Sequence, residues 1–270
     1  MSAELPQIAV IGCGAMGGAM IRGWLAAGWP PDRLAGYDAR PEAPAALGVQ
    51  ALPSLEASLD AALVVVAVKP HAVCGVVSSL SAHVGRLAER QKTAPLVASV
   101  AAGVTQRRLE EAAEGRFRVV RTMPNLAVAS GEGMVACADV LVDDERRLAD
   151  ALFAPLGGAL WLDNEDHFAA FTALVGSGPA YLFVFAEALA DAAVAEGLPR
   201  ALAARCAAAM LRGASALLAT EAGSPAELKD RVASPSGTTI EGLLALDAHG
   251  FRAAVHHALR AAARRSRELS

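Results

Sequence analysis

The sequence has 270 residues, enough for one large domain or two ordinary ones, and its formal net charge is −4. This acidic balance argues against a nucleic-acid partner, which would need a basic face. Hydrophobic residues make up 54% of the chain, but the longest strongly apolar run, residues 61–68, is too short to span a bilayer. We therefore expect neither a nucleic-acid partner nor a membrane segment.

The first half of the chain alternates short apolar runs with segments of helical length. The runs are rich in β-branched residues and apolar on both faces, which is typical of a parallel sheet covered by helices on both sides. We predict strands at residues 7–12, 33–38, 62–68, 95–100, 117–122, 133–138 and 158–162, with helices such as residues 15–28 and 143–157 between them.

After Asn164 the strand signals stop and long helical patterns follow, at residues 180–197, 199–220 and 251–269. Ala, Leu and Val surround some of these helices on nearly all sides, and about a hundred residues of helix cannot bury that much apolar surface alone. We predict a homodimer through these helices; a dense bundle within one chain is the alternative. The domain boundary is placed between residues 1–163 and residues 164–270.

A glycine fingerprint follows the first predicted strand. Gly12, Gly14 and Gly17 form G-x-G-x-x-G at the start of a helix. The first glycine permits a tight turn, the second lets the backbone approach a pyrophosphate, and the third lets helix and strand pack closely. Asp38 stands at the end of the second predicted strand, where such domains carry an acidic residue. The pattern predicts a Rossmann-type, doubly wound dinucleotide-binding domain.

The type of nicotinamide cofactor stays open at this point. Asp38 would accept hydrogen bonds from a ribose 2′-hydroxyl, whereas Arg40 could pair with a 2′-phosphate. Later strands end in Lys69, in residues 100–104 and in residues 121–125, whose small side chains and Asn125 suit a flat nicotinamide ring. A solvated lysine and plain turns would give the same pattern.

No nucleophilic constellation is apparent, and the six histidines form no metal-ligand cluster. Residues 234–239 instead place Ser and Thr hydroxyls at a helix start, beside which a C=N or C=O group could accept hydride. A purely structural N-cap is the other interpretation. The four cysteines show no C-x-x-C spacing. The apolar segment that begins at Ile8 follows Glu4 without a basic region and is interrupted by glycines, unlike a signal peptide, so we expect reduced thiols in the cytoplasm.

Residues 175–200, 228–243 and 265–269, together with the fingerprint and residues 67–70, 101–105 and 121–125, resemble the pyrroline-5-carboxylate reductase family. The resemblance runs from about Ile8 to the C-terminus. It implies an α/β fold with an N-terminal Rossmann-type domain and a C-terminal all-α dimerisation domain, in dimers that some members assemble into rings. It also implies that hydride from NADPH, or alternatively from NADH, reduces the small cyclic imine 1-pyrroline-5-carboxylate to L-proline in the last step of proline biosynthesis.

The fingerprint and the resemblance together predict the site residues. Those expected to bind the cofactor are Ile11, Gly12, Cys13, Gly14, Ala15, Met16, Gly17, Asp38, Arg40, Ser54, Ala67, Val68, Lys69, Pro70, Ala101, Ala102 and Asn125. Those expected to bind the substrate are Ser234, Pro235, Ser236, Gly237, Thr238 and Thr239. The N–H groups of Gly237 and Thr238 are expected to grip the substrate carboxylate. Thr239 is expected to hydrogen-bond the imine nitrogen as the catalytic residue, in a site completed across the dimer.

The sequence departs from the family pattern at three places. Ser236 stands where the family usually has the first of two glycines, which predicts a shifted backbone angle. Leu126 and Ala127 replace a Thr-Pro pair, and Ser54 replaces an Asn near the cofactor ribose. A reductase for another cyclic imine or a 2-keto acid is one alternative function. A non-catalytic NAD-sensing regulator is another, against which the intact hydroxyl loop argues.

Overall fold

The computed structural model describes residues 5–85, 93–220 and 223–269. The chain divides into two compact units, which we call the sheet unit (residues 1–176 and 262–270) and the helical unit (residues 177–261). The last helix, α12 (Phe251–Leu269), begins in the helical unit and ends in the sheet unit. The domain boundary placed at residues 163 and 164 stays a prediction.

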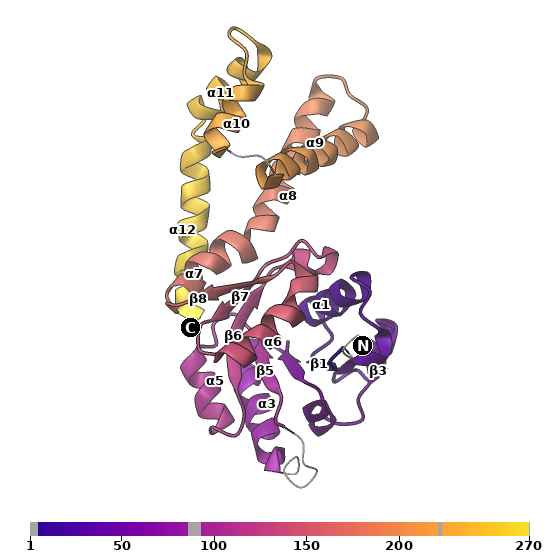
Figure 1. The fold of residues 1–270 in the computed structure, drawn as a ribbon. Coiled ribbons are helices and arrows are strands. Elements are labelled where there is room, and N and C mark those ends of the chain that lie inside the picture. The colour runs from indigo at the N-terminus through magenta and orange to yellow at the C-terminus, as the bar shows by residue number, and fades with distance from the viewer. Residues whose placement is uncertain (1–4, 86–92, 221–222, 270) are drawn as a thin grey trace. The chain divides into compact units, whose positions relative to one another are not determined.

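The sheet unit is built on eight strands in the order β3-β2-β1-β4-β5-β6-β7-β8 (Figure 1). This order reverses at β1, from which the chain winds outward in both directions, as in doubly wound dinucleotide-binding folds. Every predicted strand is present, and the strands are β1 (Ile8–Ile11), β2 (Leu34–Tyr37), β3 (Gln50–Ala51), β4 (Leu63–Val66), β5 (Leu96–Ser99), β6 (Val119–Pro124), β7 (Val135–Ala138) and β8 (Ala159–Leu162).

Two features of the sheet differ from the sequence prediction. The edge strand β3 was missed, because its two residues are both exposed and carry no apolar pattern. The pair β6–β7 is antiparallel, whereas all other neighbours are parallel. The connection between them holds just η3 (Leu126–Ser130), which is too short for the crossover that a parallel pair requires. The expectation of a fully parallel sheet is therefore wrong at this pair.

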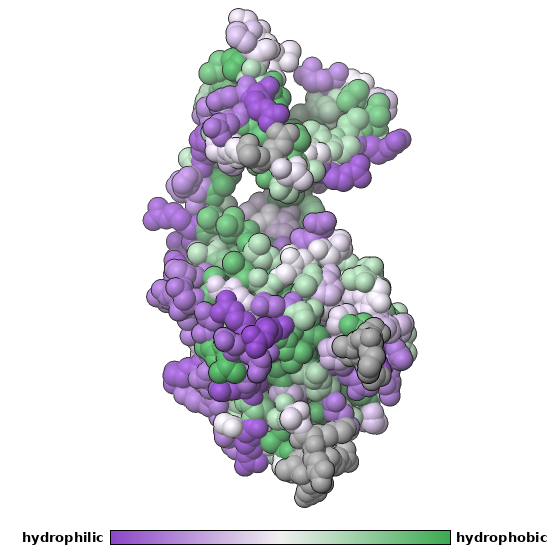
Figure 2. Space-filling view, viewed as in Figure 1, coloured by the Kyte–Doolittle hydropathy of each residue, from purple (hydrophilic) through white to green (hydrophobic). Residues whose placement is uncertain are grey.

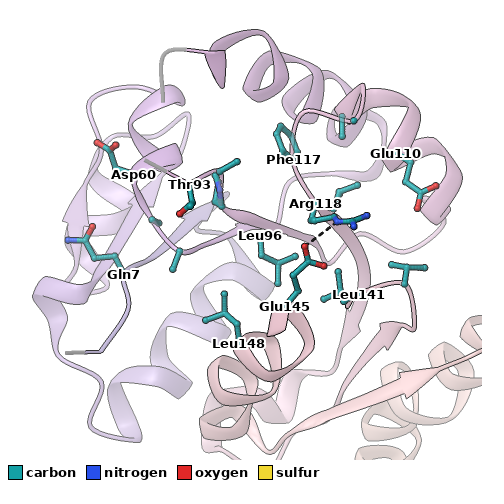
Figure 3. Close-up of a pocket in the computed structure, with 18 of the residues that line it drawn as sticks. Gln7, Asp60, Thr93, Leu96, Glu110, Phe117, Arg118, Leu141, Glu145 and Leu148 are labelled. Atoms are coloured by element: carbon teal, nitrogen blue, oxygen red, sulfur yellow. Dashed lines mark hydrogen bonds and ion pairs between the residues drawn. The ribbon is translucent and has the colours of Figure 1, made fainter. Parts of the chain in front are cut away.

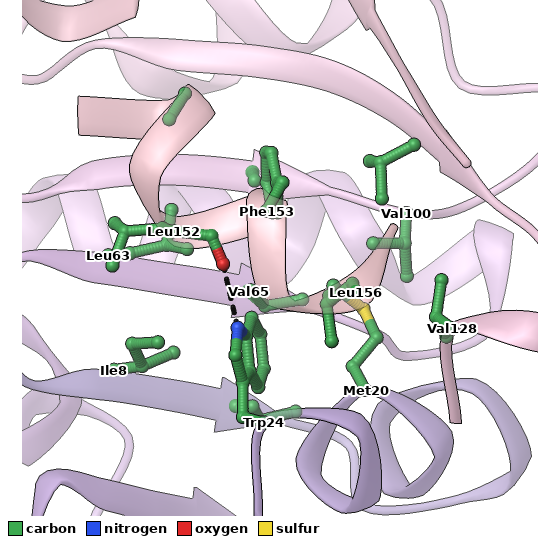
Figure 4. Packing of buried hydrophobic residues seen from close by; sticks show 14 of the residues in the cluster. Ile8, Met20, Trp24, Leu63, Val65, Val100, Val128, Leu152, Phe153 and Leu156 are labelled. Atoms are coloured by element: carbon green, nitrogen blue, oxygen red, sulfur yellow. Dashed lines mark hydrogen bonds between the residues drawn. The ribbon is translucent and has the colours of Figure 1, made fainter. Parts of the chain in front are cut away.

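Helices cover both faces of the sheet because successive strand residues point to opposite sides. Leu63 and Val65 pack with α1 (Ala15–Ala26) and α6 (Asp143–Phe153), and Val64 and Val66 pack with α3 (Pro70–His83) and α5 (Gln106–Ala113). Figure 4 shows the first cluster, in which Trp24 Nε1 donates to the Leu152 carbonyl at 2.7 Å and ties α1 to α6. Among the described residues of this unit, the other helices besides η3 are α2 (Glu42–Ala46), α7 (His167–Phe171), η1 (Pro31–Arg33), η2 (Glu56–Asp60), η4 (Ala154–Leu156) and the π-helical η5 (Thr172–Gly176).

The helical unit contains α8 (Gly178–Ala195), α9 (Arg200–Thr220), α10 (Pro225–Val232), α11 (Thr238–Ala248) and the first part of α12. The three predicted long helices are present. Among its described residues, the buried hydrophobic side chains are those of Ala190, Ala203 and Ala207, where α8 packs on α9. Larger apolar side chains lie outside; Phe183 is 62% exposed and Val184 66% exposed, and Figure 2 shows apolar surface on these helices.

Two helical stretches, His167–Ala195 and Arg200–Thr220, are long and apolar enough to cross a membrane by length and composition alone. Within the chain, 22% and 6% of their most apolar windows are buried. The described part of the chain therefore leaves most of the apolar surface of these helices exposed. Composition alone does not show whether lipid or another protein surface would cover it.

Candidate cofactor and substrate sites

A cavity of about 740 Å³ lies at the carboxyl ends of β1, β2, β4 and β5, where the strand order reverses. Open α/β sheets bind their ligands at this point. The predicted cofactor residues that line it are Ile11, Gly12, Gly14, Ala15, Met16, Asp38, Ala67, Val68, Lys69, Pro70, Ala101 and Ala102. Their part in cofactor binding stays a prediction, but the fold brings them together around one space.

The three fingerprint glycines each meet a different spatial requirement. Gly12 has φ +94°, and a Cβ on it would lie 2.7 Å from the Ala67 carbonyl oxygen of the neighbouring strand end. A Cβ on Gly17 would overlap the Gly12 carbonyl oxygen, so this glycine lets α1 approach β1. A Cβ on Gly14 would meet nothing within 4 Å, which leaves its surroundings open to a ligand.

The start of α1 fits a pyrophosphate. Gly14 is its N-cap and provides no side-chain cap, so the first main-chain N–H groups of the helix remain available to an anion. No acidic residue lies in the first turn of α1 to repel one. A dinucleotide therefore fits the cradle that the fingerprint forms.

Asp38 organises the fingerprint loop as well as facing the cavity. Its Oδ2 accepts the Cys13 N–H at 2.7 Å, and its Oδ1 accepts the Arg40 N–H at 2.9 Å. The Arg40 guanidinium lies beside it, with Nε 3.6 Å from Oδ1, and its side chain is 66% exposed. A carboxylate has about four acceptor positions, so a ribose hydroxyl could still be bound, and the pairing of Arg40 with a 2′-phosphate stays a prediction.

The other predicted cofactor residues lie outside the cavity lining. Arg40 and Ser54 lie beyond it, Cys13 and Gly17 face the protein interior, and Asn125 Oδ1 accepts the Met134 N–H at 3.2 Å. Asn125 is thus used within the β6–β7 connection. The lining residues that the sequence analysis missed are Tyr37, Ala39, Leu55, Val76 and Val100. Tyr37 and Ala39 flank Asp38, so adjacency in sequence was the available signal.

The buried thiols of the sheet unit are not nucleophiles. Burial, and then the negative charge of Asp38, raise the pKa of the Cys13 thiol to about 11. Burial also raises the pKa of the Cys137 thiol well above its usual range. Both groups therefore stay protonated at neutral pH. Within the described part of the chain, no group of three or more His, Cys, Asp or Glu residues could hold a metal ion.

A second cavity, of about 950 Å³, opens at the opposite, amino edge of the sheet (Figure 3). The Arg118 Nε–Glu145 Oε1 pair, 3.1 Å apart, lies in it, over an apolar floor that includes Leu96 and Leu148. None of the predicted site residues lines this cavity. Its larger volume is therefore no reason to prefer it over the cavity at the fingerprint.

The predicted substrate loop, residues 234–239, lies in the helical unit and leads into α11. Ser236 adopts φ +58°, the left-handed conformation that a glycine would take, so the expected shift of the backbone angle is wrong. Gly237 has an ordinary φ, but a Cβ on it would overlap Ser234 Oγ and lie 3.1 Å from the Ser234 carbonyl oxygen. A side chain at position 237 would therefore require Ser234 to change its side-chain rotamer and the turn to shift slightly.

The first turn of α11 presents donors that no side chain caps. Its N-cap is Gly237, which has no side chain, and Thr238 and Thr239 are the first two helical residues. The Gly237 N–H donates to the Ser234 carbonyl at 3.0 Å, so it is already used in the turn. This moves the expected carboxylate contact from Gly237 to the N–H groups of Thr238 and Thr239, which have no intrahelical acceptor at this position in an α-helix.

Comparisons with known proteins cover both halves of the chain. Residues 165–269 match the family model described as pyrroline-5-carboxylate reductase dimerisation, and residues 7–103 match the model described as NADP oxidoreductase, coenzyme F420-dependent. The pyrroline-5-carboxylate reductase of Glycine max is 38% identical over 99% of this chain and 97% of its own length. The chain belongs to the pyrroline-5-carboxylate reductase family.

Solved structures of this family share the fold along the whole chain. A pyrroline-5-carboxylate reductase from Coxiella burnetii superposes with a TM-score of 0.86 at 30% identity, covering 99% of both chains. Pyrroline carboxylate reductase from Plasmodium falciparum, solved with NADP bound, gives a TM-score of 0.85 at 25% identity over 98% of both chains. The predicted fold class, a Rossmann-type domain followed by an all-α dimerisation domain, is confirmed.

Proposed function

We propose that this chain is a pyrroline-5-carboxylate reductase that forms L-proline from 1-pyrroline-5-carboxylate with hydride from NADPH, in the last step of proline biosynthesis. The observation that carries the proposal is similarity over the full length to reductases of this name, in a chain that has both the cofactor cavity and the hydroxyl loop. A regulator that merely senses NAD would need no such loop, and the loop therefore favours an enzyme.

The cofactor is proposed to lie along the cavity at the carboxyl edge of the sheet. The start of α1 holds the pyrophosphate, Arg40, exposed beside Asp38 just outside the lining, pairs with the 2′-phosphate, and Ala101 and Ala102 border the nicotinamide. When bound, NADPH supplies the hydride. The positive charge of Arg40 is the feature of this site that favours NADPH over NADH.

The substrate is proposed to bind at the start of α11. Its carboxylate accepts hydrogen bonds from the main-chain N–H groups of Thr238 and Thr239, where the helix dipole also favours negative charge. The Thr239 hydroxyl hydrogen-bonds the imine nitrogen and orients it while a proton arrives from water. A protonated imine is already electrophilic, so no strong acid is required. Completion of the site across the dimer stays a prediction.

A second copy of the chain is proposed to cover the exposed helices. The dimerisation model spans residues 165–269, and the side chains left open there, such as Phe183 and Val184, are those that an obligate interface buries. We thus propose that a partner subunit, rather than lipid, covers α8 and α9, and that dimers assemble further into a ring. We also propose the cytoplasm as the location, since all four cysteines are free thiols, as a reducing compartment keeps them.

A spectrophotometric assay at about 340 nm tests the proposal, since it follows the loss of the reduced nicotinamide. We expect rapid oxidation of NADPH with 1-pyrroline-5-carboxylate, slower oxidation of NADH, and proline as the product by mass spectrometry. A 2-keto acid and a cyclic imine without the carboxylate serve as comparison substrates. Equal or faster turnover of either comparison substrate, or NADPH binding with no turnover, would contradict the proposal.

A further inference from the structure

The loop between β5 and α5 borders the cofactor cavity and is contacted by two segments that are distant in sequence. Val100, Ala101 and Ala102 line the cavity. The next residue, Gly103, has φ +79° and lies against the end of α12. Beyond it, Gln106 opens α5 and donates its main-chain N–H to Glu165 Oε1 at 2.7 Å.

The contact between Gly103 and α12 is close enough to fix the loop. A Cβ on Gly103 would overlap the Leu269 carbonyl oxygen and lie 2.9 Å from the Leu269 carbonyl carbon. Space and φ both therefore require glycine here. Ser266, about one turn earlier on α12, is buried, so the helix end is seated on the sheet unit rather than lying free.

The contact on the other side of the loop is also held firmly. Glu165 Oε1 accepts from Arg121 Nη1 at 2.6 Å as well as from Gln106. Arg121 is buried, and its guanidinium lies over the Phe168 ring, 4.3 Å from the centroid. A charge-assisted pair supported by this stacking gives the carboxylate a fixed place at the start of α5.

Both contacts come from the segments that join the two units. Glu165 precedes the helical unit in sequence, and Leu269 lies in the segment that returns from it. We propose that Gly103 is a positioning residue for the cofactor: the end of α12 packed on it holds Ala101 and Ala102 in place, so that NADPH binding depends on how α12 is seated. The inference rests on the proposed function in one respect, that the cavity binds NADPH.

The test compares two alanine variants that carry similar backbone strain. Gly103→Ala places a side chain at φ +79° against Leu269, whereas Gly115→Ala places one at φ +67° with nothing within 4 Å. The dissociation constant of NADPH is measured by fluorescence without imine, and kcat and both KM values by the 340 nm assay. For Gly103→Ala we expect the dissociation constant and the KM of NADPH to rise at least about tenfold, with the KM of the imine unchanged. For Gly115→Ala we expect a smaller loss of thermal stability, due to backbone strain without the overlap, and no change in either constant.

A chain that stops after Glu268 removes the contact without touching the loop. It should weaken NADPH binding by itself, and adding Gly103→Ala to it should have a smaller effect than in the full chain, because the two changes act on one contact. Equal NADPH affinities of the Gly103→Ala and Gly115→Ala variants, or strictly additive effects, would overturn the inference. Should Gly103→Ala fail to fold by circular dichroism, unchanged NADPH affinity in the shortened chain overturns it instead. A wild-type protein that binds no NADPH contradicts the proposed function, whereas one that binds NADPH without reducing the imine leaves this test fully usable.

Discussion

The sheet unit and the helical unit use apolar residues in opposite ways. In the sheet unit, strands such as β4 are completely buried between two helical layers of the same chain. In the helical unit, α8 is also rich in apolar residues, yet Ala190 is its single buried residue. The first unit closes its own core, and the second presents its apolar side chains to the outside.

This difference separates two tasks in one chain. The sheet unit needs no partner to hold the fingerprint loop, because Gly12, Gly17 and Asp38 make their contacts within it. The start of α11 lies in the unit whose own core is limited to three alanines, where we expect loss of the proposed partner surface to disturb the turn at Gly237 as well. We therefore expect substitutions in the two units to have separable effects on cofactor binding and on catalysis.

We expect the largest difference between the two units when a charge is placed on the exposed face of α8. In the proposed homodimer, Val184→Asp would bury a carboxylate in the interface, at a cost of several kcal/mol. We expect loss of the dimer and of activity, while NADPH still binds to the sheet unit. Sedimentation and NADPH fluorescence measure the two effects. Val142→Asp is the control, since Val142 is 53% exposed in the sheet unit. A stable dimer of the Val184→Asp variant, or loss of the dimer in the Val142→Asp variant as well, would contradict the difference drawn between the two units.

The next largest effect is expected at the hydroxyl loop. Thr239→Val keeps the shape and deletes the hydroxyl, which should lower kcat/KM for the imine by about 10²–10³-fold with little change in NADPH binding. Thr238→Val is the control, because it removes a neighbouring hydroxyl and keeps the main-chain N–H that is proposed to bind the carboxylate. Steady-state kinetics decide the result. Equal effects of the two substitutions would show that Thr239 serves α11 as a structural residue alone.

The same comparison explains what the sequence could predict. Interior strands such as β4 were found because Val64, Val65 and Val66 are buried on both faces and give an unbroken apolar run, whereas the exposed edge strand β3 was missed. The apolar excess of α8 and α9 also showed in the sequence, since composition alone reveals a helix that one chain cannot cover. Both predictions depend on local pattern.

The features that the sequence could not show are long-range contacts. The apolar run that predicts β7 carries no information on strand direction; the short connection before it was visible in the sequence, but which strand β7 pairs with was not. The contact of Leu269 with Gly103 joins residues at distant positions of the chain. In the sequence, Gly103 looks like an ordinary turn glycine and Leu269 like an ordinary residue at the end of a helix. The two main-chain hydrogen bonds of Asp38 likewise depend on how the fingerprint turn meets the end of β2.

A smaller and more selective effect is expected at Arg40 in the sheet unit. Arg40→Ala removes the guanidinium beside Asp38 and should raise the KM of NADPH about tenfold, because the site is exposed and one charge-assisted contact is lost. The KM of NADH should stay unchanged or fall, and the dimer should remain intact. Kinetics with both cofactors provide the internal control. Equal losses for NADPH and NADH would show that Arg40 does not distinguish them.

The smallest effect compares the left-handed residues of the two units. Among the described residues, Ser236 and Glu114 are the non-glycine residues with positive φ, at +58° and +52°. Glycine relieves about 1 kcal/mol of strain at such a position and loses part of that gain to the entropy of the unfolded chain.

We therefore expect Ser236→Gly and Glu114→Gly to raise the melting temperature slightly and to similar extents. We also expect Ser236→Gly to leave kcat/KM for the imine nearly unchanged, because the left-handed backbone, rather than the Ser236 hydroxyl, shapes the turn before α11. Differential scanning calorimetry measures the first effect and the imine assay the second. A gain of stability together with a large loss of kcat/KM would assign the hydroxyl a direct contact with substrate. If Ser236→Gly lowers the melting temperature and Glu114→Gly does not, the Ser236 hydroxyl stabilises the turn in this chain.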